Sequence, residues 1–185
     1  MYRLCLFAAT LLCGLSLAAC SNKDVSPNDR PRCWSYVLGD LAIGVKSEVG
    51  AAQVFALANS LNFRVDNMSG FFYVSGLPTD SLAYVKRVLL SKPYLNTRGF
   101  TSGNVSIHSA DQRIHVVDKL FDMTPTNQAD WLQTLQVLQL TDEARCQGCK
   151  AVMLKVPAGS ERHWVSELAN NPLIHWTELN CIRRM

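Results

Sequence analysis

The sequence predicts an α+β fold made of two similar halves, and three observations lead to this prediction. Short apolar runs typical of strands alternate along the chain with segments whose apolar residues recur at helical spacing. Hydrophobic residues make up 48% of the 185 residues, which is enough to form a substantial core. The third observation is an internal repeat, because residues 72–95 and residues 154–174 share one order of strand, turn, helix, proline and strand.

The repeat is aligned around its predicted helix. The valine before the helix (Val74 and Val156) and the proline after it (Pro93 and Pro172) recur at nearly the same offset. Duplication of a split β-α-β unit explains this spacing, and the alternative is chance similarity between two ordinary β-α-β stretches. With duplication, each half resembles the ferredoxin-like fold, an antiparallel sheet with two helices on one face.

The first predicted half spans residues 34–108. Its predicted strands span residues 38–46, 63–65, 71–74 and 105–108, with a turn over 66–70. One helix is expected over 50–62, with its apolar face formed by Val54, Leu57, Ala58 and Leu61. A second helix is capped by Thr79 or Asp80, buries Leu82, Val85 and Leu89, and ends before Pro93.

The second predicted half spans residues 109–185. Its predicted strands span residues 113–117, 151–156 and 174–179. A helix is expected to begin at Pro125 and to bury Trp131, Leu135 and Leu138, although a strand over 132–140 is an alternative. Residues 146–149 are a predicted turn, and Ser160 is expected to cap a helix that buries Trp164, Val165 and Leu168.

Residues 1–19 have the pattern of a secretory signal peptide. Arg3 supplies a positive charge, residues 4–17 are almost wholly apolar, and small residues precede Cys20. A transmembrane helix is the alternative, but such a helix needs about 20 apolar residues. This stretch is shorter, and polar residues 21–24 follow it at once. The segment therefore predicts export.

The sequence Leu17-Ala18-Ala19-Cys20 resembles the lipobox of bacterial lipoproteins. This resemblance implies that Cys20 is acylated, with palmitate among its lipids, and becomes the mature N-terminus. Ser21 after the cysteine resembles an outer-membrane address, so the protein is expected to be lipid-anchored there and to face the periplasm. Residues 20–33 are polar with two prolines, which predicts a flexible tether between the anchor and the folded part.

Four of the seven cysteines remain after the signal peptide and Cys20 are set aside: Cys33, Cys146, Cys149 and Cys181. An even number of cysteines in an exported protein indicates two disulfides. Three pairings are available, and the sequence does not choose among them. We favour a local Cys146–Cys149 loop and a Cys33–Cys181 bond that joins the two ends of the domain.

Catalysis, metal binding and cofactor binding are not indicated by the sequence. The pair Cys146 and Cys149 is an alternative redox dithiol, but polar residues precede it and a predicted strand follows, whereas a redox cysteine needs a helix N-terminus. A zinc site normally has a second closely spaced ligand pair, and no such pair accompanies these cysteines. His108 and His115 face each other if residues 109–112 form a turn, although surface or partly buried strand positions are the commoner role of such residues.

Two further observations bear on partners. The formal net charge of +3 is too weak to indicate nucleic-acid binding. In the predicted strand that contains residues 71–74, Phe71 and Tyr73 point to one face and Phe72 to the other. An exposed aromatic face suits protein binding, so Phe71 and Tyr73 are candidate partner-binding residues. The alternative is that the two halves bury these faces against each other.

The second half resembles the propeptide inhibitors of subtilisin-type proteases, in which a helix also leads into Asn-Pro, two apolar residues and a final strand, here Asn171-Pro172-Leu173-Ile174. Paired ferredoxin-like units on a lipid anchor also resemble the ring-building lipoproteins of type III secretion machines. We therefore predict a non-enzymatic binding or assembly module of the cell envelope, with an envelope protein or a second copy as partner. The alternatives are an inhibitor or immunity protein against a protease or toxin, and a thiol-disulfide oxidoreductase.

Overall fold

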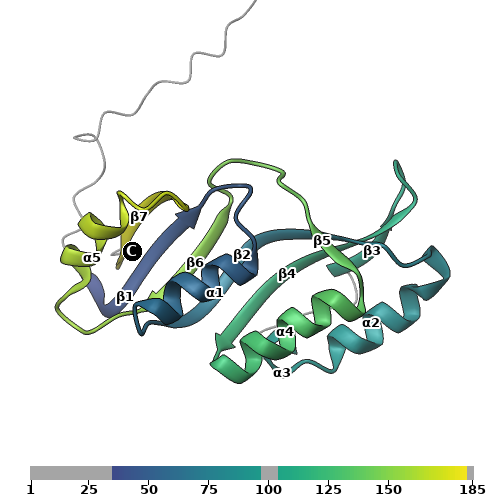
Figure 1. Ribbon diagram of the computed structural model, residues 1–185, viewed down its shortest axis with the longest axis horizontal. Coiled ribbons are helices and arrows are strands. Elements are labelled where there is room, and N and C mark those ends of the chain that lie inside the picture. Colours follow the sequence, from purple (N-terminus) through teal and green to yellow (C-terminus); the bar gives the residue numbers. More distant parts are fainter. Residues whose placement is uncertain (1–34, 97–103, 183–185) are drawn as a thin grey trace, which may run out of the picture. The chain divides into compact units, whose positions relative to one another are not determined.

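The computed structural model describes residues 35–96 and 104–182, which form a mixed α+β fold with an antiparallel sheet (Figure 1). The strands are β1 (Tyr36–Val45), β2 (Arg64–Ser75), β3 (Val105–His108), β4 (Arg113–Met123), β5 (Leu140–Asp142), β6 (Lys150–Lys155) and β7 (Ile174–Cys181). The helices are α1 (Ala51–Ser60), α2 (Leu82–Leu90), α3 (Pro93–Asn96), α4 (Pro125–Val137) and α5 (Glu161–Leu168), with a 3₁₀ turn at Thr79–Ser81 before α2. The predicted signal peptide, tether, Cys20 and Cys33 lie outside the described residues.

The sheet has the order β3-β4-β2-β6-β1-β7, and β5 pairs with β2 beside β6. Every paired strand runs antiparallel to its neighbour. Strands from the predicted ranges 34–108 and 109–185 therefore alternate across one sheet, because β6 lies between β1 and β2 and β4 lies between β2 and β3. The described residues, 35–96 and 104–182, lie in one compact unit.

β2 is continuous where a turn over residues 66–70 was predicted, so that prediction is wrong. The residues expected to turn remain in the strand, and the pairing register shifts beside them. One shift lies between Val65 and Asn67 in the pairing with β6, and the other between Ser69 and Phe71 in the pairing with β4. Gly70 has a φ of 80° at the second shift, a conformation that glycine adopts without steric cost. A side chain at Gly70 would also collide with the backbone of Cys149, so this bulge needs glycine for two reasons.

The apolar faces of α1, α2, α4 and α5 meet one face of the sheet in a single contiguous core. In α4, Thr124 accepts a hydrogen bond from the backbone N–H of Asn127, and Pro125 occupies the first helical turn, so the helix begins where the sequence predicts. The predicted Trp131 is fully buried and lies edge-on to Tyr73 and Tyr94, at centroid distances of 5.6 and 6.1 Å. The alternative strand over 132–140 is wrong, since the helix continues to Val137.

Among the described residues, no helix combines the length and apolar character needed to cross a membrane.

Candidate functional site

The segment between β5 and β6, residues 143–149, forms a short loop that we call the disulfide loop. Cys146 and Cys149 are joined within it, with their Cα atoms 5.7 Å apart, which confirms the predicted local pair. Gly148 between them has a φ of 74°, which suits the tight turn. Cys181 is also disulfide-bonded, and its predicted partner Cys33 lies outside the described residues.

An ion pair between buried Lys150 and partly buried Asp142 holds the two ends of the disulfide loop together. Lys150 is only 2% exposed, and its ammonium donates to Asp142 Oδ2 at 2.6 Å. It also donates to the carbonyl oxygens of Ser47 and Val49, at 2.7 and 3.0 Å. These three acceptors match the three protons of an ammonium group. Burial raises the pKa of Asp142, even though the neighbouring ammonium favours its charged form.

The disulfide loop lies on the face of the sheet that carries no helix. The guanidinium of Arg145 stacks over the ring of Phe72, 4.8 Å from the ring centroid. Phe72 points away from the core because its two strand neighbours point into it. At the other end of the loop, the indole N–H of Trp176 donates to the carbonyl of Gly148 at 3.2 Å. The ring of Trp176 covers Gly44, where a Cβ atom would collide with it.

The burial of Phe71 and Tyr73 contradicts their prediction as partner-binding residues. Both are 1% exposed and belong to the core beneath the helices. The strand does alternate as expected, but the helices cover the face that carries these two aromatic rings. The opposite face is therefore the one that presents side chains to solvent at this part of β2.

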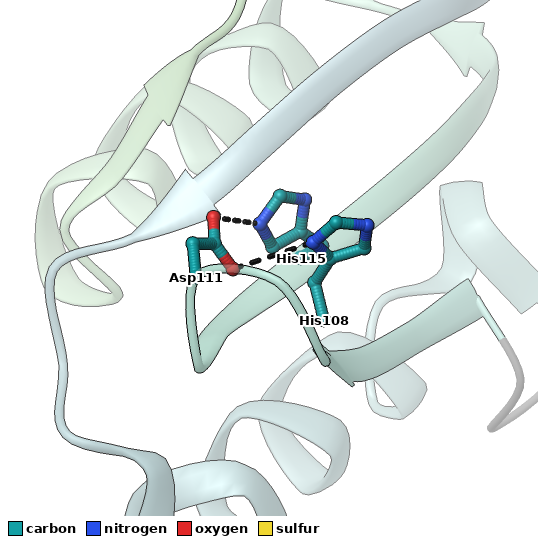
Figure 2. A group of neighbouring side chains, drawn as sticks. All are labelled: His108, Asp111 and His115. Carbon is teal, nitrogen blue, oxygen red and sulfur yellow. Dashed lines mark hydrogen bonds and ion pairs between the residues drawn. The ribbon is translucent and has the colours of Figure 1, made fainter.

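His108, Asp111 and His115 form a cluster of potential metal ligands (Figure 2). His115 Nε2 lies 2.8 Å from Asp111 Oδ2, and His108 Nδ1 lies 3.5 Å from Asp111 Oδ1. The potential ligand atoms all lie within 4.8 Å of one another. His115 is 9% exposed, whereas the other two side chains are exposed. We refer to these three residues as the histidine cluster.

The β3–β4 hairpin brings the histidine cluster together. His115 pairs with Ser106 and His108 pairs with Arg113, so the two histidines are diagonal neighbours on one face, and their ring centroids are 4.7 Å apart. The turn between the strands carries Asp111, whose carboxylate accepts from the backbone N–H of Arg113 at 3.1 Å. The predicted turn over 109–112 is present, and it makes the two histidines face each other.

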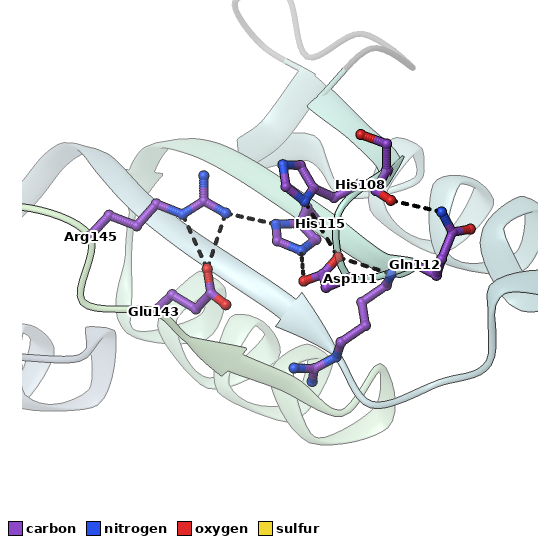
Figure 3. A network of polar contacts seen from close by, with 8 residues as sticks. His108, Asp111, Gln112, His115, Glu143 and Arg145 are labelled. Carbon is purple, nitrogen blue, oxygen red and sulfur yellow. Dashed lines mark hydrogen bonds and ion pairs between the residues drawn. The ribbon is translucent and has the colours of Figure 1, made fainter.

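Arg145 connects the disulfide loop to the histidine cluster (Figure 3). Its guanidinium lies 2.7 Å from His115 Nδ1 and donates to Glu143 Oε2 at 3.0 and 3.1 Å. Because a guanidinium can only donate, His115 Nδ1 must be the acceptor. The ring proton then lies on Nε2 and is donated to Asp111, and this hydrogen bond lowers the pKa of Asp111.

The surroundings of Cys146 and Cys149 are those of a structural disulfide. β5 precedes the pair and β6 follows it, so no helix begins between Asp142 and Lys150. A redox dithiol depends on helix N–H groups to stabilise its thiolate, and this loop does not provide them. The geometry does not favour thiol-disulfide exchange.

A small cavity of about 170 Å³ lies between α2 and α4 and is lined by Val88, Lys92, Asp130 and neighbouring residues. Its charged groups satisfy one another, since Lys92 donates to Asp130 at 2.8 Å and Tyr94 donates to the same carboxylate at 2.6 Å. Pockets that enclose small-molecule ligands usually measure about 300–1,000 Å³. The histidine cluster is therefore the stronger candidate site.

Sequence reasoning considered the histidines and the Cys146–Cys149 pair separately. It did not find the contact between His115 and Arg145, which are 30 positions apart in the chain. No local motif signals this contact, because it depends on β4 and the disulfide loop lying on either side of β2.

No family model, no curated protein and no solved structure matches this chain. Its function is therefore inferred from its own residues and their geometry.

Proposed function

We propose that this chain is an exported lipoprotein that acts as a non-enzymatic binding or assembly module of the cell envelope. Lipid on Cys20 anchors it to the outer membrane, with the folded part in the periplasm. The disulfide of Cys146 and Cys149 and the disulfide-bonded state of Cys181 support export, because such bonds form and persist in oxidising compartments.

We infer that the sheet contains two ferredoxin-like units that share β2. The chain order β1-α1-β2-β6-α5-β7 places four strands in the spatial order β7-β1-β6-β2. The chain order β2-α2-β3-β4-α4-β5 places four strands in the order β5-β2-β4-β3. Both sets have the β-α-β-β-α-β order and the same strand arrangement, which supports two ferredoxin-like units. The repeat seen in the sequence aligns β2-α2 with β6-α5, which occupy different places in the two units, and α3 begins at Pro93 where the repeat predicted a strand. In this interpretation the second unit is inserted between β2 and β6 of the first.

The observation that carries the binding function is the helix-free face beside the disulfide loop. Val117 on β4 is 42% exposed there and pairs with Phe72 on β2. Around them lie Arg145 and the histidine cluster, so an apolar centre has a polar rim, as in protein interfaces. The loop is closed by a disulfide and fixed at its base by Lys150, so little ordering is needed when a partner binds.

Site-specific photocrosslinking in intact cells tests this surface. A photoreactive residue at Val117 is expected to give a discrete crosslinked band, either with one envelope protein or with a second copy. The matched control is Leu90 on α2, which is 39% exposed but belongs to the helical side. Equal bands at both positions, or none at Val117, would contradict the proposed surface. A single soluble hydrolase or toxin as partner would favour the inhibitor alternative.

Anchoring is tested separately by Cys20→Ala in the full chain. The unchanged protein is expected to incorporate a labelled fatty acid and to sediment with the outer membrane. The variant is expected to lose both properties, because the lipid is attached through the cysteine sulfur. Equal labelling of the two proteins would contradict lipidation at Cys20 without affecting the crosslinking result.

A further inference from the structure

We propose that His108, Asp111 and His115 bind one divalent transition-metal ion of the zinc class, and that binding displaces Arg145 from His115. This metal site goes beyond the binding function proposed above and does not depend on it. Its argument rests on the donor atoms, their spacing, the hairpin that carries them and the proton on the His115 ring.

The donor set is two imidazole nitrogens and one carboxylate, a combination that binds first-row divalent metals and leaves coordination positions open. Zinc lies about 2.0–2.1 Å from nitrogen and oxygen ligands, so tetrahedral ligand atoms are about 3.3 Å apart. The two histidine–aspartate distances, 2.8 and 3.5 Å, are close to that value. The two imidazole nitrogens lie within 4.8 Å of each other, so small side-chain rotations bring the three donors around one ion.

The three donor residues are held in place by the β3–β4 hairpin. His108 and His115 lie on paired strands, and Asp111 lies in the turn that connects them. A hydrogen bond from the backbone N–H of Gln112 to the carbonyl of His108, at 2.9 Å, closes that turn. Because His108 and Asp111 are exposed, an ion can enter from solvent, and water or a partner side chain can fill the remaining positions.

Arg145 opposes metal binding in this conformation. A metal ion bound at His115 Nε2 replaces the proton there, so the ring proton must lie on Nδ1. In this structure Nδ1 accepts a hydrogen bond from Arg145 at 2.7 Å. A proton on Nδ1 would therefore point at an N–H of the guanidinium, and two donors would face each other. A histidine that binds a metal normally donates its other N–H to an acceptor such as a carbonyl, a carboxylate or water. The guanidinium must therefore leave when the ion binds.

The displacement changes the surface of the disulfide loop. Arg145 directly precedes Cys146, stacks over Phe72 and is held by Glu143. When the guanidinium leaves His115, the polar rim beside Val117 rearranges. Metal occupancy and the shape of the helix-free face are thus coupled through one side chain.

Zinc titration of the full lipidated chain in detergent, without reductant, tests the site. Calorimetry or competition with a chromophoric chelator is expected to show one zinc ion per chain. His108→Ala and His115→Ala should each weaken binding at least tenfold. His163→Ala, in a histidine outside the cluster, should leave the affinity unchanged. Absence of one-to-one binding up to about 1 mM zinc, or equal affinity in the cluster variants and the His163 control, would overturn the site.

The role of Arg145 has its own test, with a charge-matched control. Arg145→Gln removes the competing donor and supplies a carbonyl that can accept from Nδ1–H, so zinc affinity should rise about threefold to tenfold. Arg113→Gln removes an exposed charge from the same hairpin and should change the affinity less. In the unchanged protein, zinc should shift the ring-nitrogen NMR signals of His115 from the Nε2–H to the Nδ1–H pattern. Equal affinities in the two arginine variants would contradict the displacement.

Discussion

The disulfide loop makes two polar contacts that differ in burial. One is the Lys150–Asp142 pair where the loop joins β5 and β6, which we call its base, and the other is the Arg145–Glu143 pair on its outer side. At the base, Lys150 and Asp142 form an ion pair in which the ammonium is almost inaccessible and has three acceptors. At the outer side, Arg145 and Glu143 are partly exposed, and the guanidinium reaches His115. The same seven-residue loop thus has an almost inaccessible ammonium on one side and a partly exposed guanidinium on the other.

Because of this difference in burial, we expect the Lys150–Asp142 pair to affect stability and the Arg145 contacts to affect binding. Removing one partner of a buried ion pair leaves an uncompensated charge, which costs about 3–5 kcal/mol. An exposed pair contributes only about 0–1 kcal/mol, because water solvates the separated charges well. The base can therefore hold the loop in place while Arg145 changes partner at little cost to the fold.

The largest expected effect is that of Lys150→Met. Asp142, which is partly buried, would lose its counterion, so the free energy of unfolding should fall by about 3 kcal/mol, the lower end of the range for buried pairs. Urea denaturation followed by circular dichroism measures this loss. Arg145→Gln is the comparison, and it should change the free energy of unfolding by less than about 1 kcal/mol. Similar losses in both variants would show that the base and the outer side do not differ.

The double variant Lys150→Met/Asp142→Leu sharpens the same comparison. It removes both charges, so it should recover part of the stability that Lys150→Met loses. No recovery would indicate that Lys150 stabilises the chain through the carbonyls of Ser47 and Val49 and not through Asp142.

An intermediate effect is expected from Cys146→Ser/Cys149→Ser. The disulfide closes a short loop, so the chain-entropy model assigns it about 2 kcal/mol, less than the buried pair. Its loss should leave β5 and β6 paired with β2, since Lys150 still holds the base. Urea denaturation measures the stability, and the fluorescence of Trp176, which donates to Gly148 within the loop, reports the local change. A loss larger than that of Lys150→Met would reverse the proposed ranking.

The smallest expected effect is a difference between the pKa values of two carboxylates, Asp142 and Asp111. The pKa of Asp142 is raised by burial, whereas the pKa of Asp111 is lowered by the hydrogen bond from His115. NMR titration of the side-chain carboxyl carbons should place the midpoint of Asp142 above, and that of Asp111 below, the ordinary value of about 3.9. Asp142→Asn and Asp111→Asn assign the two signals, and the reverse order would contradict the structure.

The two carboxylates should therefore affect stability in opposite ways as the pH changes. The folded state binds the Asp142 proton more tightly than the unfolded state, so the contribution of Asp142 falls as the pH rises from about 3.9 through its higher folded pKa. The folded state binds the Asp111 proton less tightly. Its contribution is present above about pH 3.9 and is lost as the pH falls through its lower folded pKa.

The sequence by itself determined most of the local structure. The helical spacing of Val85 and Leu89 predicted the buried face of α2, and Pro125 marked the start of α4. The close spacing of Cys146 and Cys149, three positions apart, favoured their pairing, and the structure confirms this disulfide. These features depend on neighbours within a few positions, where periodicity, capping and turn chemistry act directly.

Only the tertiary structure decided which strands lie side by side and which face of the sheet is open. Burial of Phe71 and Tyr73 follows from the helices lying on that face, which strand alternation cannot specify. Continuity of β2 through Gly70 depends on β4 and β6 pairing along its edges. The contact of Arg145 with His115 joins distant segments on either side of β2, and such pairings are set by global packing rather than by any local pattern.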